Sequence, residues 1–403
     1  MTERVRIGLI GAGFAAHFHL ASYGKVWGED FEVTAIAGRS PAKAKQLADR
    51  FSISRCHESF EALLGDPDLD AVDICVPNHL HIPLIVQAAA QGKHIICEKP
   101  LGGFFGPPAA DDGWSADGFP RESMLGNVVA EMARVSEAIQ RAGVTFCYGE
   151  NWIYAPPVVK VGRLMAASQS TILRIEGEES HSGSHSAAAL RWRTAGGGSL
   201  VRLCVHPIGA ALQLKREEGL RRDGRPIRPV AVSCQVARLT AIESFRAEPR
   251  KHVVDGWQDV EDFATITVTF DDGSVAQLTS TDTRLGGIRN TLTAHGSRAV
   301  ATANINPNTT CQAYTPDGAY FEDEYIVEKI ETKEGWTFPA PDEDAVTGYP
   351  EELRDFVGAI AHRREPRSGL SIAMDTLLVV YAGYLSAEQG KSVDLRPYLE
   401  ANP

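Results

Sequence analysis

The chain has 403 residues, enough for two domains that each bury a core of their own. Its formal net charge of -12 argues against nucleic acid or an anionic membrane as the main partner and leaves small polar substrates open. A strand pattern begins by residue 5 and no apolar run approaches roughly 18 residues, so we expect a soluble, cytoplasmic protein with no membrane span. The seven cysteines include no Cys-x-x-Cys pair, which favours reduced core residues over disulfides or zinc.

The first predicted element is a strand at residues 5–10, followed at once by a glycine-containing turn and a helical stretch to residue 20. The turn, Gly11-Ala-Gly-Phe-Ala-Ala16, is typical of a dinucleotide-binding site. Gly11 permits the tight turn, Gly13 lets the backbone approach a pyrophosphate, and Ala16 is small enough for the helix to pack on the strand. The candidate cofactor contacts here are Gly11, Gly13, Phe14 and Ala15.

The second predicted strand, at residues 31–37, should end near the adenosine ribose, where an acidic residue would bind the 2′-hydroxyl of NAD. The sequence has Arg39 and Ser40 there instead. Arg39 could bind the 2′-phosphate of NADP, or it could stack on adenine and leave NAD possible. The choice between NAD(H) and NADP(H) therefore stays open. Ser40 is also a candidate N-cap for the helix that follows.

Two further apolar runs predict buried strands, and polar residues follow each of them. Residues 71–76 lead into Pro77-Asn-His-Leu-His81, and residues 94–97 stop at Glu98-Lys99-Pro100. The alternation of strands and helices predicts a parallel, doubly wound sheet, in which ligands bind beyond the carboxyl ends of the strands. Lys99 could polarise or protonate a substrate oxygen there, and the alternative is a loop lysine in a salt bridge. The remaining candidate cofactor contacts are Pro77, Asn78, His81, Glu98 and Lys99.

Three motifs together resemble the Gfo/Idh/MocA oxidoreductases, which include inositol and glucose-fructose oxidoreductases. They are Gly11-x-Gly13-x-x-Ala16-x-x-His19, Pro77-Asn-His-Leu-His81 and Gly92-Lys-His-Ile-Ile-Cys-Glu-Lys-Pro-Leu101. The resemblance implies an α/β protein in which a Rossmann domain precedes an α/β domain with a large, mainly antiparallel open sheet that often mediates oligomers. We place the domains at residues 1–150 and 151–403 and expect a homo-oligomer, a dimer or tetramer. The resemblance also implies that Lys99 is the catalytic lysine.

Between the motifs and the second domain lie a long loop and a candidate hinge. Residues 102–123 are rich in Gly and Pro yet carry four aromatic residues, and their place directly after Lys99 suggests a lid or specificity loop. In the hinge, Asn151, Trp152 and Tyr154 could offer a sugar a hydrogen bond, a stacking surface and a phenol. Tyr154 is thus a possible catalytic helper, and the alternative is that Trp152 and Tyr154 are core aromatics.

The second domain should be built from antiparallel strands. Period-two patterns follow residue 171, with hairpin signals at residues 271–273, 295–297 and 316–318. Two closing helices are expected, one from Pro350 and one at about residues 373–389.

Residues 196–207, Gly-Gly-Gly-Ser-Leu-Val-Arg-Leu-Cys-Val-His-Pro, carry the second catalytic candidate. The resemblance implies an aspartate and, four residues later, a histidine on one helical face. The histidine is present as His206, but Arg202 holds the aspartate's position. His206 can act as general acid and base on a carbinol hydroxyl. The alternative is a helix-start residue before Pro207.

Positive charge gathers around this histidine. Arg191, Arg193 and Arg202 fit an anionic substrate group such as a carboxylate, phosphate or sulfonate, and the alternative is a solvated basic patch. His181 lies in a nearby Ser- and Gly-rich stretch and is a further candidate substrate contact. His181 and His185 have i,i+4 spacing, but the Ser and Gly residues between them predict a loop, so we expect no metal site.

These observations support three hypotheses. The first is a nicotinamide-dependent oxidoreductase that transfers a hydride at a secondary alcohol of a sugar, glycoside or cyclitol, either neutral or with an anionic group. The second is a redox-neutral, NAD-dependent glycosidase that oxidises, eliminates, hydrates and re-reduces its substrate, for example a sulfoquinovoside. The third, a catalytically silent NAD(P)-sensing regulator, ranks last because Lys99 and His206 are both present.

Overall fold

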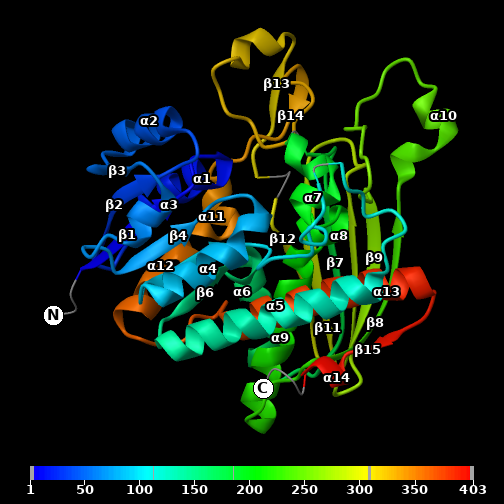
Figure 1. Ribbon diagram of the computed structural model, residues 1–403. Coiled ribbons are helices and arrows are strands. Elements are labelled where there is room, and N and C mark those ends of the chain that lie inside the picture. The colour runs from blue at the N-terminus through cyan, green and yellow to red at the C-terminus, as the bar shows by residue number, and fades with distance from the viewer. Residues whose placement is uncertain (1–3, 112, 185, 307–309, 400–403) are drawn as a thin grey trace.

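A computed structural model describes residues 4–111, 113–184, 186–306 and 310–399 and contains two large sheets (Figure 1). The first sheet has six strands in the order β3-β2-β1-β4-β5-β6, and every neighbouring pair is parallel. This is the strand order of a dinucleotide-binding Rossmann sheet. Its strands are β1 (Val5–Ile10), β2 (Phe31–Ala37), β3 (Arg55–His57), β4 (Ala71–Ile74), β5 (His94–Glu98) and β6 (Phe146–Gly149).

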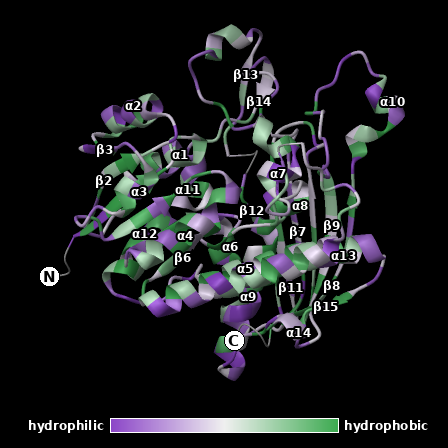
Figure 2. Cartoon of the chain, viewed as in Figure 1, coloured by the Kyte–Doolittle hydropathy of each residue, from purple (hydrophilic) through white to green (hydrophobic). Residues whose placement is uncertain are grey.

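Helices connect these strands and cover the sheet, as the alternating pattern predicts. Ser40 accepts a hydrogen bond from the Lys43 amide and Pro41 opens α2, while Gly143 ends α5 in the left-handed region, where a residue without a Cβ is favoured. Hydrophobic and hydrophilic stretches alternate along α5 because one side faces the core (Figure 2). The helices are α1 (Phe14–Tyr23), α2 (Pro41–Phe51), α3 (Phe60–Leu64), α4 (His81–Ala90) and α5 (Arg121–Ala142).

The second sheet has seven strands in the order β12-β11-β7-β10-β9-β8-β15. Five of its six pairings are antiparallel, and β7 with β10 is the parallel one. The expected α/β architecture with a large, mainly antiparallel second sheet is confirmed. The strands are β7 (Ile172–Ser180), β8 (Pro229–Ala237), β9 (Phe263–Phe270), β10 (Val275–Thr281), β11 (Arg289–Gly296), β12 (Val300–Asn304) and β15 (Val393–Asp394).

Two of the three hairpin signals form hairpins, at residues 271–273 between β9 and β10 and at residues 295–297 between β11 and β12. The third prediction is wrong. Residues 316–318 lead from β13 (Ala313–Thr315) into a short 3₁₀ helix, and β13 pairs instead with β14 (Gly335–Thr337). A Pro-Asp-Gly turn therefore begins a longer excursion here, which projects beyond the two large sheets in Figure 1.

Helices α9 (Val205–Asp223) and α13 (Leu370–Gln389) pack on the second sheet. Helix α13 is long and apolar enough to cross a membrane, contrary to the expectation from sequence, but 83% of its most apolar window is buried. Gly383 brings it close to β9, since a Cβ there would lie 3.0 Å from Ile266. Such burial is that of a core helix. The remaining helices of this part are α6 (Pro156–Ala167), α7 (Trp192–Ala195), α8 (Ser199–Arg202), α10 (Glu243–Arg246) and α14 (Arg396–Leu399).

After β14 the chain returns to the first sheet through α11 (Glu343–Thr347) and α12 (Tyr349–Ala361). The ring of Tyr349 lies 4.7 Å from that of Phe18 on α1, and the Tyr148 amide next to the end of β6 donates to the carbonyl of Ser368. Residues far beyond position 150 thus contribute to the first layer. The division of the chain at residue 150 stays a prediction.

Candidate active site

The glycine turn after β1 is shaped for close approach by a ligand. Gly11 has a φ of +129°, and a Cβ there would lie 2.1 Å from the carbonyl oxygen of Cys75. Gly13 caps α1, and a Cβ on Gly13 would meet nothing within 4 Å. The free amides at the start of α1 therefore face open space, which suits a pyrophosphate. Ala16 is fully buried, as its expected packing role requires.

The remaining candidate cofactor residues lie along the same edge of the sheet. Asn78 donates to the carbonyl of Ala195 at 2.9 Å, which links the segment after β4 to α7. The ring of His81 lies between the carbonyls of Pro100 and Val76, at 2.7 and 2.9 Å. His81 therefore holds the chain around Lys99 rather than pointing outward to a ligand.

Behind Lys99 lies a buried chain of charged groups. Glu98 accepts a hydrogen bond from the Lys99 amide, and its other oxygen lies 3.0 Å from Nε2 of His19. Nδ1 of His19 lies 2.8 Å from Asp73. Burial by itself would lower the pKa of His19, but the Asp73 and Cys75 groups outweigh it and raise that pKa well above its usual value. A histidine cation between two carboxylates thus fixes the backbone that carries Lys99.

The His19, Asp73 and Cys75 ligand atoms lie within 4.8 Å of one another, a spacing that could hold a metal ion. Their atoms are already joined by hydrogen bonds within the cluster. The expectation of no metal site stays a prediction.

Lys99 reaches the second domain. Its Nζ donates to the main-chain carbonyl of Arg202 at 3.0 Å, one helical turn before His206. The positive charge of Lys99 is close enough to His206 to help lower the pKa of that imidazole. The two residues that the motifs single out therefore lie in one site.

Buried neighbours hold the imidazole of His206. Nδ1 lies 2.7 Å from a carboxylate oxygen of Glu150, which directly follows β6. The ring of Trp152 stacks on the imidazole, with the ring centroids 5.9 Å apart and an angle of 16° between the ring planes. Burial lowers the pKa of His206 to about 4 and raises that of Glu150 well above its usual value. His206 is therefore neutral near pH 7. Its Nδ1 is hydrogen-bonded to Glu150, and its Nε2 is on the opposite side of the ring from that contact.

A second carboxylate lies on the other side of the imidazole. Oε2 of Glu179, at the end of β7, is 3.9 Å from Nε2 of His206. Burial raises the pKa of Glu179 to about 7, although His206 and Lys99 both act to lower it.

Two hinge residues do not reach this site, contrary to expectation. Tyr154 donates to Asp355 at 2.8 Å and accepts from the Ser368 amide at 2.9 Å. Asn151 is buried and donates to the carbonyl of Thr347 at 2.8 Å. These hydrogen bonds connect the hinge after β6 to the returning segment that contains α11 and α12. Only Trp152 of the three contacts a catalytic candidate, through His206.

Two sequence models of known families match this chain. A sequence model described as an oxidoreductase family with an NAD-binding Rossmann fold matches residues 5–103, and one described as the GFO/IDH/MocA C-terminal domain matches residues 171–302. The two matches together cover more than half of the chain. The chain belongs to the GFO/IDH/MocA oxidoreductase family.

Individual relatives are more distant. An uncharacterized oxidoreductase of Rhizobium meliloti is 43% identical over 100 residues, 25% of this chain and 29% of that protein. Levoglucosan dehydrogenase of Pseudarthrobacter phenanthrenivorans is 37% identical over 105 residues, 25% of this chain and 27% of that protein. The chain thus matches less than a third of the length of either relative. The solved structure of GenD2 from gentamicin A biosynthesis, in complex with NAD, superposes with a TM-score of 0.76 at 24% identity, covering 98% of this chain and 97% of that one.

This GFO/IDH/MocA chain departs from the family resemblance at Arg202. The guanidinium pairs with the buried carboxylate of Asp282 and lies 4.8 Å from the ring of Trp257. Only the main-chain carbonyl of Arg202 contacts Lys99. The side chain is therefore committed to a protein partner rather than free to bind an anionic substrate group.

The other candidates for an anion site are also held within the protein. Arg193 donates to the carbonyls of Phe105 and Ala110. His181 is buried, accepts from the Gly183 amide and lies 3.7 Å from Asp282. Arg191 immediately precedes α7. His185 lies outside the described residues.

The long loop after Lys99 is tied to both parts of the fold. Phe104 donates its amide to Tyr381 and accepts at its carbonyl from Trp192, and the Ala116 amide donates to Asp259. The rings of Phe104, Trp114 and Phe119 pack on one another. These contacts anchor the loop, which favours a specificity loop over a lid; its role stays a prediction.

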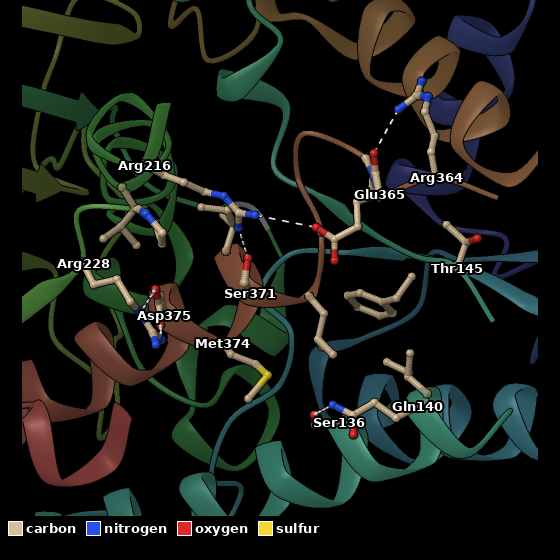
Figure 3. A pocket seen from close by; sticks show the side chains of 18 of the residues that line it. Ser136, Gln140, Thr145, Arg216, Arg228, Arg364, Glu365, Ser371, Met374 and Asp375 are labelled. Carbon is tan, nitrogen blue, oxygen red and sulfur yellow. Dashed lines mark hydrogen bonds and ion pairs between the residues drawn. The ribbon is translucent and has the colours of Figure 1, made fainter. Parts of the chain in front are cut away.

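A separate cavity of about 560 Å³ lies at the amino end of β6 (Figure 3), whereas Glu150 follows its carboxyl end. The charged side chains of the cavity pair with their neighbours: Arg228 with Asp375 at 2.6 Å, and Arg216 with Ser371 and Glu365. The cavity is therefore distinct from the catalytic candidates.

Sequence reasoning missed three functional neighbours of the catalytic candidates, Glu150, Glu179 and Asp282. Glu150 could have been found, because it directly follows the apolar run that forms β6, which ends at the same edge as β5 and Lys99. Glu179 and Asp282 gave no local signal. Their proximity to His206 and Arg202 depends on the pairing of β7 with β10 in the second sheet.

Proposed function

We propose that this chain is a nicotinamide-dependent oxidoreductase that transfers a hydride at a secondary alcohol carbon of a sugar, glycoside or cyclitol. The observation that carries the proposal is the hydrogen bond from Lys99 to the carbonyl of Arg202 at the end of α8, four residues before His206 on α9. An amine and a neutral imidazole at one site suit the removal of a hydroxyl proton. The names of relatives, levoglucosan dehydrogenase and inositol 2-dehydrogenase, favour this substrate class.

The residues present fit a dinucleotide. The glycine turn leaves open space before α1, and Arg39 and Ser40 follow β2 where the adenosine ribose would lie. A bound nicotinamide would supply the hydride chemistry. Because neither Arg39 nor Ser40 is acidic, either NAD(H) or NADP(H) can serve.

The chain's own residues then have separate tasks. Lys99 donates a hydrogen bond to the reacting oxygen and stabilises the negative charge that develops there. Glu150 holds Nδ1 of His206, which leaves Nε2 to contact the substrate hydroxyl. Trp152 covers one face of the imidazole, so the ring keeps its orientation and water is excluded from that side.

The test is a panel of sugars, cyclitols and glycosides, including levoglucosan and myo-inositol, assayed with NAD and with NADP. Steady accumulation of reduced cofactor with at least one alcohol, lost in the Lys99→Ala variant, is the expected result. Aglycone release from a glycoside without net reduced cofactor would instead support the redox-neutral glycosidase. Cofactor binding without turnover of any member would favour the sensing regulator.

An anionic group on the substrate needs a test of its own, since Arg193 and Arg202 are engaged by protein groups. Comparing a neutral glycoside with its sulfonate counterpart tests it, because a recognised anion lowers KM. We also propose a homo-oligomer, dimer or tetramer, from the family resemblance, and a cytoplasmic location from the sequence pattern. Light scattering of the purified protein measures the subunit number.

A further inference from the structure

Strand β7 brings a carboxylate to the imidazole of His206. Glu179 is 8% exposed, and its Oε2 lies 3.9 Å from Nε2 of His206. This oxygen is buried and has no hydrogen-bond partner among the described residues. A buried oxygen with unused acceptor capacity is costly unless a ligand or water satisfies it.

The spacing allows one hydroxyl to bridge the two groups from the side. A hydroxyl at ordinary hydrogen-bond distance from Nε2 of His206 can also lie at that distance from Oε2 of Glu179, because the two atoms are 3.9 Å apart. Lys99 lies close enough to influence both groups electrostatically. A substrate hydroxyl placed there would contact an imidazole and a carboxylate, with the ammonium of Lys99 nearby.

Charged and titratable groups on four other segments of the chain influence the pKa of Glu179. They are His206 on α9, Lys99 after β5, Glu150 after β6, and Glu328 on the segment before β14. Burial raises the pKa of Glu179 to about 7 and lowers that of His206 to about 4. Near neutral pH the carboxylate is therefore the better proton acceptor of the two.

We propose that Glu179 is a catalytic residue whose carboxylate accepts the proton of the substrate hydroxyl as the carbonyl forms. The O–H bond breaks and its proton goes to Oε2 of Glu179, while the C–H electron pair leaves as hydride to the nicotinamide and C=O forms. In the reverse direction the Glu179 carboxylic acid returns the proton. His206 orients the hydroxyl by donating from Nε2–H to its oxygen, while Nδ1 accepts from the carboxyl of Glu150, whose pKa burial raises well above its usual value. This inference rests on the proposed oxidoreductase function.

The test compares Glu179→Gln with Glu178→Gln as a matched control. Glu178 is next on the same strand, but its carboxylate accepts from Ser180 and pairs with Arg289, away from His206. With whichever alcohol of the panel the wild type oxidises, kcat/KM should rise with pH through about 7. Glu179→Gln should lose that rise and roughly 100-fold or more in kcat, whereas Glu178→Gln should keep both.

A rate for Glu179→Gln within a few fold of wild type, with the pH inflection unchanged, would overturn the proposal. Glu179→Asp, which keeps a carboxylate, should retain the inflection at a reduced rate. If no alcohol is oxidised, the proposed function itself fails. Infrared difference spectra of the wild type between pH 5 and 9 then still decide whether a buried carboxylic acid titrates near neutrality, and the absence of such a band also overturns the assignment.

Discussion

Lys99 and Arg202, 103 residues apart in sequence, meet through the Nζ of one and the main-chain carbonyl of the other at 3.0 Å. The contact joins the end of β5 in the first sheet to α8 beside the second. A main-chain acceptor fixes the ammonium without neutralising it, so the charge stays available to a substrate oxygen. The position of the lysine therefore depends on the two parts of the fold being docked.

We expect Lys99→Ala to lower kcat by roughly 100- to 10,000-fold, since the oxygen that receives negative charge loses its donor. Cofactor affinity should change little, because the glycine turn and the start of α1 bind the pyrophosphate independently. Steady-state rates and fluorescence titration with reduced cofactor measure the two effects. Lys43→Ala on the outer part of α2 is the control, and equal losses in both variants would contradict the assignment.

Much of the first domain could be predicted because its signals are local. The Gly11 to Ala16 turn and the Ser40 cap depend on residues adjacent in sequence, and both form as expected, although β4 ends at Ile74 rather than at residue 76. Lys99 and His206 were found by motif spacing. Their carboxylate neighbours were not, because Glu179 and Asp282 reach the site through strand pairings that no short stretch of sequence specifies.

Failures of prediction have the same origin. Tyr154 and Asn151 were assigned to a substrate because they follow a strand end, yet the returning segment around α12 supplies partners for both. The long loop was interpreted as a lid or specificity loop, and the hydrogen bonds of its backbone with Tyr381, Trp192 and Asp259 favour the second. In each case a distant segment satisfied groups that the sequence left open.

Replacing His19 should destabilise the protein in a pH-dependent way. His19→Ala leaves Asp73 and Glu98 buried without the cation between them, which we expect to cost about 3–5 kcal/mol. The folded pKa of His19 is raised above the usual 6.5, so its contribution is fully present below about pH 6.5 and is lost as pH rises through the folded pKa. Urea unfolding at several pH values measures the difference.

The control for that experiment is His17→Ala on the same helix, since the pKa of His17 is lowered by burial and by Arg50 and no carboxylate pair depends on it. A His19→Ala defect that is constant with pH would contradict a charged His19. A defect that shrinks at alkaline pH supports it.

Arg39, two residues after β2, should control the choice between NADPH and NADH. Arg39→Asp places a negative charge where a 2′-phosphate would lie, so we expect the Kd for NADPH to rise by about 10- to 100-fold and that for NADH to change less. Fluorescence titration of both cofactors gives the ratio. Equal weakening of NADPH and NADH would instead mean that Arg39 stacks on adenine.

Restoring the family's aspartate should not improve this chain. Arg202→Asp would leave Asp282, which is buried, without its cation and would add a second negative charge beside it, so we expect a loss of about 3–5 kcal/mol in unfolding free energy. Adding Asp282→Asn should recover much of that loss, because it removes the unpaired charge. Thermal and urea unfolding of the single and double variants measure the recovery. If Arg202→Asp is as stable as the wild type and turns over faster, the ion pair with Asp282 is dispensable and Arg202 occupies an ordinary family position.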